Sequence, residues 1–437
     1  MAVLDELRQA SRLRGLHRQQ RQVLIGAHRL LSERGEANSQ VLAHELLMLI
    51  AALPPEGLEL LFDRLSADFN PDPQAVLAAA QAYADAPTAL HLQALMHSSE
   101  PPRQELFRRL NRSPGATGHL VRLRRSLLSG LAKHPEWRSV ESDLLHLFGS
   151  WFNPGFLQMR QVDWNSPAQL LEQIIRHEAV HEIDGWDDLR RRLQPDRRLF
   201  AFFHPQLPEE PLIFVEVALL PEMPGAIAPL IAKSAPTVKP DQFKVAVFYS
   251  ISNCEPGLKG VSLGNFLIKR VAEHLQREHP KLKTFCTLSP IPGFAAWLQR
   301  SSDFADLTGF KKAQLERLRA ARETLVQASA GELGRLSQAE TVNRLDETGQ
   351  QALLRLAAAY LIGQTPMIGG DPVARFHLDN GARLERLNPM GNRSTKGLKQ
   401  ACGLMVNYLY DLGKIEHHHE AFTQGEISYS RTVAALL

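Results

Sequence analysis

Two residues capable of acid–base chemistry lie on short segments of predicted β-strand in the second half of the sequence. Ser289 ends the predicted strand 283–289, a position where the carboxyl ends of strands form ligand sites in α/β sheets. His377 is predicted to lie mid-strand in a hairpin over 373–388, because an Asn-Gly turn separates two alternating segments. A capping serine and a structural histidine are the plain alternatives. If both residues are functional, their side chains lie within hydrogen-bonding reach and serve one site.

A glycine-rich loop over 257–265 stands between a predicted strand, 243–252, and an amphipathic predicted helix, 263–278. Backbone N–H groups at a helix N-terminus favour an anion, and glycines allow a phosphate to approach closely. The loop matches neither the P-loop nor the dinucleotide fingerprint. A plain turn remains possible, but a strand, a short glycine-containing loop and a helix also hold the pyrophosphate of coenzyme A in acetyltransferase-type folds.

His177-Glu178-Ala179-Val180-His181 has the spacing of a zinc-peptidase motif on a predicted helix, 167–182. Two histidines four residues apart share a helix face and could bind zinc, with the glutamate as base. No histidine at a suitable spacing supplies a third ligand, and both histidines flank an apolar stripe. Structural histidines are therefore favoured. The run 417–419 is interpreted as a solvated turn, because consecutive histidines on a helix diverge by about 100°.

The composition places these residues in an ordinary folded protein. The 437 residues include 44% hydrophobic and 22% charged residues, which excludes extended disorder and predicts two or three domains. A net charge of +3 is too even for a dedicated nucleic-acid binder. The three cysteines are far apart and outside any CxxC, which indicates a reducing compartment and argues against a zinc–thiolate site. Without a transmembrane or signal segment, a cytoplasmic location and no membrane partner are expected.

The chain divides into two regions that differ in predicted secondary structure, and the candidate residues lie in the second. Residues 1–150 are predicted to be almost entirely helical and contain no cluster of catalytic groups, so they are expected to form a structural or oligomerisation domain. Residues 151–437 combine predicted strands and helices, which makes the fold class α+β or α/β. Further predicted strands cover 198–204 and 212–220, helices occupy 311–362, and a last helix surrounds 403–412.

The sequence resembles the biotin-independent, single-chain malonyl-CoA decarboxylases. The segments that carry this resemblance cover most of 150–410: WFNPGFLQMRQVDWNSPA (151–168), FFHPQLPEEPLIFVEVALL (202–220), FYSISNCEPGLKGVSLGNFLIKRV (248–271), TLSPIPGFAAWL (287–298), PVARFHLDNGARLERLN (372–388) and GLMVNYLY (403–410). The resemblance extends more weakly into the helical half at RLLSERGE (29–36).

The resemblance implies a helical N-terminal oligomerisation domain, 1–150, and a mixed-sheet catalytic domain, 151–437, with the fold of the GCN5-related acetyltransferases. It implies that malonyl-CoA is converted to acetyl-CoA and CO2 without a cofactor or metal, in a homo-oligomer such as a dimer or tetramer. By position, Ser289 and His377 match the active-site residues. The positions matching the coenzyme A loop are Lys259, Gly260, Val261, Ser262, Leu263, Gly264 and Asn265.

The expected chemistry suits these residues. Loss of CO2 leaves a thioester enolate, which a histidine titrating near neutrality could protonate at carbon. Ser289 could orient the substrate carboxylate or act as a proton acceptor, and the sequence leaves both roles open. The other classes to be separated are an acyl-CoA-dependent N-acetyltransferase, a non-catalytic acyl-CoA sensor and a zinc peptidase built on His177 and His181. The missing peroxisomal tail is expected of a bacterial-type enzyme.

Overall fold

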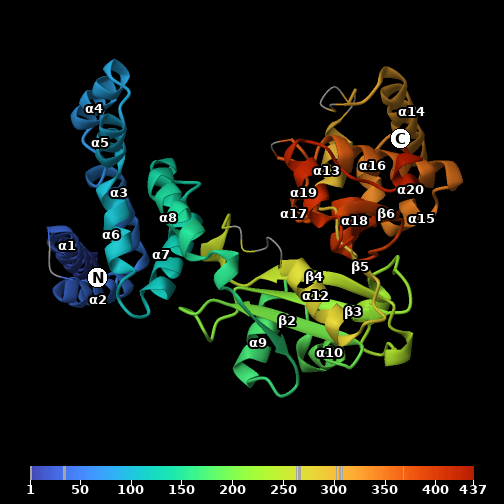
Figure 1. The fold of residues 1–437 in the computed structure, drawn as a ribbon, viewed down its shortest axis with the longest axis horizontal. Helices are drawn as coiled ribbons and strands as arrows, with labels where there is room; N and C mark the ends of the chain where they lie inside the picture. The colour runs from blue at the N-terminus through green and yellow to red at the C-terminus, as the bar shows by residue number, and fades with distance from the viewer. Residues whose placement is uncertain are drawn as a thin grey trace. The chain divides into compact units, whose positions relative to one another are not determined.

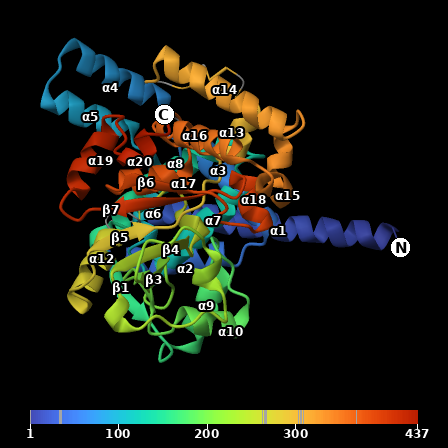
Figure 2. The same ribbon diagram turned by 90° about the vertical axis from the view of Figure 1, so that its right-hand side faces the viewer.

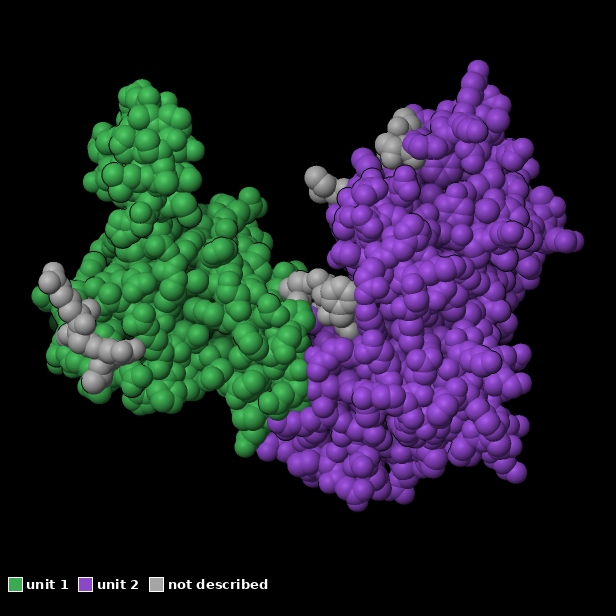
Figure 3. All heavy atoms as spheres, viewed as in Figure 1, with its two compact units in different colours: residues 1–158, 203–210, 255–262 green, residues 159–202, 211–254, 263–437 purple. Residues whose placement is uncertain are grey.

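The computed structural model describes residues 2–32, 36–261, 263, 267–301, 303–304, 307, 309–367 and 369–437. By internal contacts, the chain divides into two compact units (Figure 3). The first unit combines 1–158 with 203–210 and 255–262. The second unit holds 159–202, 211–254 and 263–437. No helix of the described residues has the length and apolar character needed to span a bilayer.

The first unit is helical, as the sequence predicts. Asp72 caps α4 by accepting a hydrogen bond from the Gln74 N–H at 2.9 Å, and proline occupies the first helical position. Its helices and 3-10 turns are α1 (Ala2–Ser32), α2 (Glu36–Ala51), α3 (Pro55–Asp68), α4 (Pro73–Asp85), α5 (Ala89–Ser99), α6 (Pro102–Leu110), α7 (Ala116–Gly130), η1 (Pro135–Trp137), α8 (Arg138–Trp151), η2 (Pro154–Phe156) and η4 (Pro256–Leu258).

The core of this unit lies between α1, α2, α3, α6, α7 and α8. Phe62, Phe107 and Trp137 are among its largest fully buried side chains. The hairpin of α4 and α5 is different, because neither helix contains a buried residue. It stands away from the other helices of this unit in both ribbon views (Figures 1 and 2).

A seven-stranded mixed sheet, in the order β1-β2-β3-β4-β5-β7-β6, forms the centre of the second unit (Figure 1). The β4–β5 pair is parallel, whereas β2–β3, β3–β4, β5–β7 and β6–β7 are antiparallel. The strands are β1 (Gln158–Val162), β2 (Arg197–Phe203), β3 (Ile213–Leu220), β4 (Val245–Asn253), β5 (Thr284–Thr287), β6 (Arg383–Asn388) and β7 (Met405–Tyr410). The strands predicted over 198–204, 212–220, 243–252 and 283–289 are confirmed within a few residues.

Helices surround this sheet. The helix between β4 and β5, α12, packs on β2 through the edge-on contact of His274 with Phe200. The remaining helices and 3-10 turns are α9 (Ala168–His177), α10 (Gly185–Arg192), α11 (Ala228–Ile231), η3 (Pro240–Gln242), α12 (Leu267–Glu278), α13 (Phe294–Arg300), α14 (Lys312–Ala328), η5 (Leu333–Ser337), α15 (Ala339–Asn343), α16 (Glu347–Gly363), α17 (Pro372–Asp379), α18 (Thr395–Ala401), α19 (Ile415–Thr423) and α20 (Arg431–Ala434).

The predicted hairpin over 373–388 is wrong in its first half, because 372–379 is the helix α17. Asp371 caps this helix by accepting hydrogen bonds from the N–H groups of Val373 and Ala374, both at 3.0 Å. Pro372 is preorganised for the first turn. The Asn-Gly pair therefore ends a helix, with Gly381 at φ +78°, and only the second strand of the prediction forms, as β6.

The predicted helix around 403–412 is also wrong, because 405–410 is the strand β7. β7 pairs with β5 on one side and β6 on the other and is buried on both faces, so its sequence shows little alternation. The preceding helix α18 ends in the left-handed region at Cys402, with φ 51°. Likewise, α9 ends at His177 rather than near 182, and 417–419 lie within the helix α19 rather than in a turn.

Candidate active site

Ser289 lies just beyond the end of β5 and is held there by backbone pairing. Its N–H donates to the carbonyl of Val406 at 2.8 Å, and its carbonyl accepts from the Val406 N–H at 2.9 Å. The hydroxyl donates to Thr287 Oγ1 at 2.8 Å. Ser289 is only 5% exposed, so its hydroxyl is held by contacts with other protein groups rather than by solvent.

His377 meets Ser289 from α17. Its Nε2 lies 3.0 Å from Ser289 Oγ, across 88 residues of sequence, so the predicted juxtaposition of the two side chains is confirmed. Its Nδ1 lies 2.9 Å from the hydroxyl of Tyr410 on β7. The imidazole also stacks on the ring of Tyr408, with centroids 4.7 Å apart and an interplanar angle of 30°. Both nitrogens and one face of the ring are thus engaged.

Burial sets the charge of this group. It lowers the pKa of His377 to about 3 and raises the pKa of Tyr410 above its ordinary value. The expectation that His377 titrates near neutrality is therefore wrong for the free site. A neutral imidazole has one donor and one acceptor nitrogen. Since Ser289 donates to Thr287, it accepts from Nε2–H, and Nδ1 accepts from the Tyr410 hydroxyl.

A buried carboxylate explains why α17 and the segment after β5 come together. Asp371, the cap of α17, also accepts hydrogen bonds from the Gly293 N–H at 3.2 Å and from the Tyr360 hydroxyl at 3.3 Å. Gly293 permits this approach, because a Cβ there would stand 2.0 Å from the Tyr360 hydroxyl oxygen. One side chain therefore starts the helix that carries His377 and fixes the turn that follows Ser289.

The pair opens on a cavity of about 290 Å³. Most of its wall is apolar, and the polar groups are few and face the same space, as is usual for a ligand site. The lining residues are Val180, Ile213, Phe248, Tyr249, Ser250, Ile251, Asn253, Ser289, Pro290, Pro372, Val373, Phe376 and His377. The cavity can hold a small acyl group beside a hydroxyl and an imidazole.

Tyr410, Thr287 and Tyr408 are site residues that the sequence analysis missed. The sequence predicts a helix around Tyr408 and Tyr410. On a helix, two residues at this spacing would point in different directions, whereas on β7 they do not. Both lie on one face of this strand, two residues apart. A period-two interpretation of 405–410 could have placed both tyrosines beside the end of a neighbouring strand. No feature of the sequence singles out Thr287.

The glycine-rich loop is described in part. Residues 256–258 form η4, Lys259 is exposed, and Gly260 has φ +83°, which only glycine adopts without strain. Leu263 is buried. Val261 is half-buried, and the remaining predicted coenzyme A positions, Ser262, Gly264 and Asn265, lie outside the described residues.

The zinc-peptidase spacing does not produce a zinc site geometry. Only His177 is helical, and Glu178 has the extended ψ of 110°, so the two histidines do not share a helix face. The Glu178 carboxylate instead accepts hydrogen bonds from the hydroxyls of Ser250 at 2.7 Å and Ser252 at 3.1 Å. His181 is buried, which lowers its pKa to about 3. The Glu178 carboxylate thus attaches the segment after α9 to β4.

Comparison with known proteins identifies the family. The malonyl-CoA decarboxylase C-terminal domain matches residues 155–437, and the N-terminal domain of the same family matches residues 69–152. The mitochondrial malonyl-CoA decarboxylase of Mus musculus is 38% identical over 332 residues, which are 73% of this chain and 67% of the relative. That of Anser anser anser is 37% identical over 324 residues, which are 71% of this chain and 64% of the relative.

Solved structures agree over nearly the whole chain. The malonyl-CoA decarboxylase from Rhodopseudomonas palustris is 45% identical, with a TM-score of 0.83 over 95% of this chain and 99% of that one. The enzyme from Agrobacterium vitis is 46% identical, with a TM-score of 0.82 and the same coverage. The chain, with its helical N-terminal region and mixed sheet, belongs to the malonyl-CoA decarboxylase family of carboxy-lyases.

Proposed function

We propose that this protein converts malonyl-CoA to acetyl-CoA and CO2, with Ser289 and His377 as its catalytic residues. The observation that carries the proposal is the row of hydrogen bonds from Ser289 through His377 to Tyr410, which faces a largely apolar cavity. Membership of the malonyl-CoA decarboxylase family supports the choice of substrate.

The apolar wall favours loss of CO2. A carboxylate is poorly solvated beside Ile213, Phe248 and Val373, whereas neutral CO2 loses nothing there. As the bond between the carboxyl carbon and the α-carbon breaks, its electron pair moves into the thioester carbonyl and forms an enolate. Polar N–H and O–H groups beside the developing oxyanion then stabilise the transition state more than the ground state. Because the thioester carbonyl accepts the electrons, the reaction needs no organic cofactor or metal.

Ser289 orients the substrate, and His377 supplies the proton. The Ser289 hydroxyl turns from Thr287 to the substrate carboxylate and holds the breaking bond perpendicular to the thioester plane. The carboxylate raises the pKa of the neighbouring imidazole, because an opposite charge favours the imidazolium. Nε2 then delivers a proton to the enolate carbon, which gives acetyl-CoA, and the ring regains its proton from water. Tyr410 holds Nδ1 in either state, since a phenol can donate or accept.

The coenzyme A part of the substrate is assigned to the loop from Lys259 to Asn265. Lys259, Gly260, Val261, Ser262, Leu263, Gly264 and Asn265 form this candidate site. The exposed Lys259 ammonium and the glycine-rich backbone suit phosphate oxygens. The mixed sheet, in which this loop joins parallel strands β4 and β5 through α12, supports an acetyltransferase-like architecture for 151–437. Residues 1–150 are assigned to self-association in a homo-oligomer.

One assay tests this function. Purified protein is incubated with malonyl-CoA, with and without prior EDTA treatment, and CO2 and acetyl-CoA are measured together. We expect equimolar products, formed at a rate that EDTA does not change and that His377→Asn lowers by at least about 10²-fold. Transfer of the intact acyl group to an added amine without CO2 release would indicate an acyltransferase, and activity lost with EDTA and restored by zinc would overturn the metal-free mechanism. Binding of malonyl-CoA without turnover would indicate a sensor.

A further inference from the structure

The helical unit contains a buried arginine whose position the oligomerisation role does not explain. The Arg124 side chain, on α7, is 1% exposed. One guanidinium nitrogen donates to the carbonyl of Gly257 at 2.7 Å, and another donates to the carbonyl of Lys259 at the same distance. Both acceptors belong to the turn that opens the proposed coenzyme A loop, and that turn is part of the same compact unit as α7.

The turn is fitted closely to α7 and α8. A Cβ at Gly257 would stand 2.2 Å from the carbonyl oxygen of Val121, so only glycine allows the turn to lie against α7. Gly260 lies near Leu145 on α8, because a Cβ added at Gly260 would stand 3.5 Å from Leu145 Cδ1. The charge of Arg124 is balanced by Glu141 on α8, which accepts from the guanidinium at 2.6 Å. A planar, rigid guanidinium suits this three-way bridge, which a lysine could satisfy only in part.

Holding a carbonyl also orients the next N–H. In a trans peptide the C=O and N–H bonds point in opposite directions, and no peptide bond here is cis. Because the Lys259 carbonyl is directed at Arg124, the Gly260 N–H is directed away from it. The Lys259 and Val261 N–H groups already donate to the carbonyls of Pro256 and Leu258 within the turn. Gly260 therefore offers its N–H on the side of the turn opposite to α7.

We propose that Arg124 is a positioning residue of the coenzyme A site, which fixes the turn 256–260 so that the Gly260 N–H is presented to a phosphate of the substrate. This inference rests on the proposed function and extends it, because it gives residues of the helical region a part in substrate binding. Arg124 contacts the loop on the side opposite to the Gly260 N–H. It therefore affects substrate binding only through the shape of the loop.

The test compares two substrates in three variants. Malonyl-CoA carries the phosphates, whereas malonyl-N-acetylcysteamine has the same reacting group without them. For Arg124→Met we expect the KM for malonyl-CoA to rise about tenfold, with kcat within about twofold, since charge-assisted hydrogen bonds that hold the loop are lost. The KM for the truncated substrate should stay unchanged. Arg124→Lys should fall between, and Glu141→Gln, which leaves both bonds to the loop carbonyls, should behave like the parent.

The outcomes separate this inference from the proposed function. A general loss of folded protein would lower the apparent kcat for both substrates and leave both KM values unchanged. Should Arg124→Met fail to fold, Arg124→Lys carries the same comparison, because it keeps the charge beside Glu141. Equal affinities for coenzyme A in parent and Arg124 variants by calorimetry, or equal effects on both substrates, would overturn the positioning role. Absence of decarboxylation by the parent protein would instead overturn the proposed function.

Discussion

At the scale of single residues, His377 is the centre of the site because everything around it limits what its ring can do. Its two nitrogens contact Ser289 and Tyr410, and Tyr408 covers one face. Burial keeps the ring neutral, so it can donate through only one nitrogen until a substrate carboxylate arrives. A residue held in this way is suited to one proton transfer in a fixed direction.

Loss of both proposed catalytic side chains should be far from additive. His377→Asn should lower kcat by about 10²- to 10⁴-fold, because it removes the proton donor, and should leave KM nearly unchanged. Ser289→Ala should lower kcat by a smaller factor. The double variant should be little worse than His377→Asn, since both residues act on one transition state. Steady-state kinetics of the three variants measures this, and losses that multiply would contradict a shared site.

The two tyrosines offer a matched pair. Tyr410→Phe removes the hydroxyl that contacts His377 Nδ1 and should lower kcat about tenfold, because the ring loses the partner that fixes it. Tyr408→Phe is the control. Its hydroxyl has no hydrogen-bond partner among the described residues, and phenylalanine keeps the stacked ring. Equal kcat values for the two variants would exclude a role for the Tyr410 hydroxyl.

The buried neutral imidazole also makes stability depend on pH. Its pKa is about 3 in the folded protein and about 6.5 in the unfolded chain, so between these values only the unfolded chain binds the proton. Its contribution is therefore complete above pH 6.5 and is lost as the pH falls. Between pH 7.5 and 5.5, the free energy of unfolding should fall by about 1.4 kcal/mol more in the parent than in His377→Asn. Urea titrations at both pH values measure this difference, and equal decreases would contradict the burial of a neutral ring.

At the scale of elements, the sequence predicted the strands β2 to β5 and the helices of the first unit, because their apolar patterns are regular and strong. It failed at two elements of the site. The Asp-Pro pair that opens α4 recurs at the start of α17, at 371–372, but the Asn-Gly turn signal favours a hairpin there. β7 is buried on both faces, so its largely apolar sequence shows no alternation and resembles a helix as much as a strand. The sequence nevertheless predicted that Ser289 and His377 lie together, because residue type and family resemblance do not depend on the element that carries them.

Phosphate binding by the glycine-rich loop can be tested by adding one negative charge at Gly260. Gly260→Asp should raise the KM for malonyl-CoA about tenfold, because a carboxylate would stand where phosphate is expected. Gly260→Asn is the matched control, since asparagine has the same size, tolerates the positive φ about as well and is uncharged. If the two variants have the same KM and the same affinity for coenzyme A, the phosphate site lies elsewhere.

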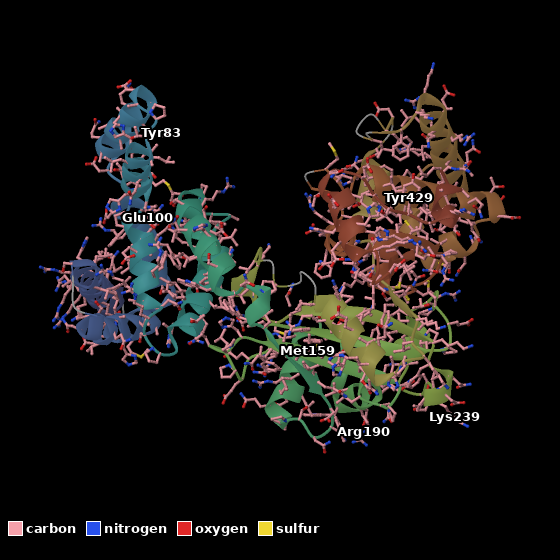
Figure 4. All side chains as sticks on the ribbon, viewed as in Figure 1. Tyr83, Glu100, Met159, Arg190, Lys239 and Tyr429 are labelled. Atoms are coloured by element: carbon pink, nitrogen blue, oxygen red, sulfur yellow. The ribbon has the colours of Figure 1, made fainter. Side chains whose placement is uncertain are left out.

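At the scale of the whole molecule, the α4–α5 hairpin is the strongest candidate for contact between copies. Neither helix contains a fully buried residue, and Leu77, Leu90 and Met96 are each more than half exposed. Figure 4, in which Tyr83 is labelled, shows this hairpin extending beyond the other helices of the same unit. Apolar side chains exposed over two helices indicate a surface that another molecule covers.

Charges placed on this hairpin should dissociate the oligomer. Leu90→Glu with Met96→Glu should shift the sedimentation coefficient to that of a monomer at micromolar concentration, because buried carboxylates are strongly unfavourable in an apolar interface. Gln93→Glu adds a charge to the same helix at an exposed polar position and should leave the assembly intact. A parent protein that sediments as a monomer, or a double variant that assembles normally, would contradict self-association through this hairpin.

The order of the strands also has a consequence for how the protein folds. β2, β3, β4 and β5 pair with neighbours in sequence, whereas β5 gains its second partner, β7, only from the C-terminal part of the chain, and Ser289 meets His377 across 88 residues. Contacts of such long sequence separation form late and slowly, because closing a long loop costs conformational entropy before the contact stabilises it. The sheet can therefore begin to form during synthesis, but the active site is completed only after the C-terminal strands have left the ribosome. Activity should lag behind the gain of secondary structure during refolding.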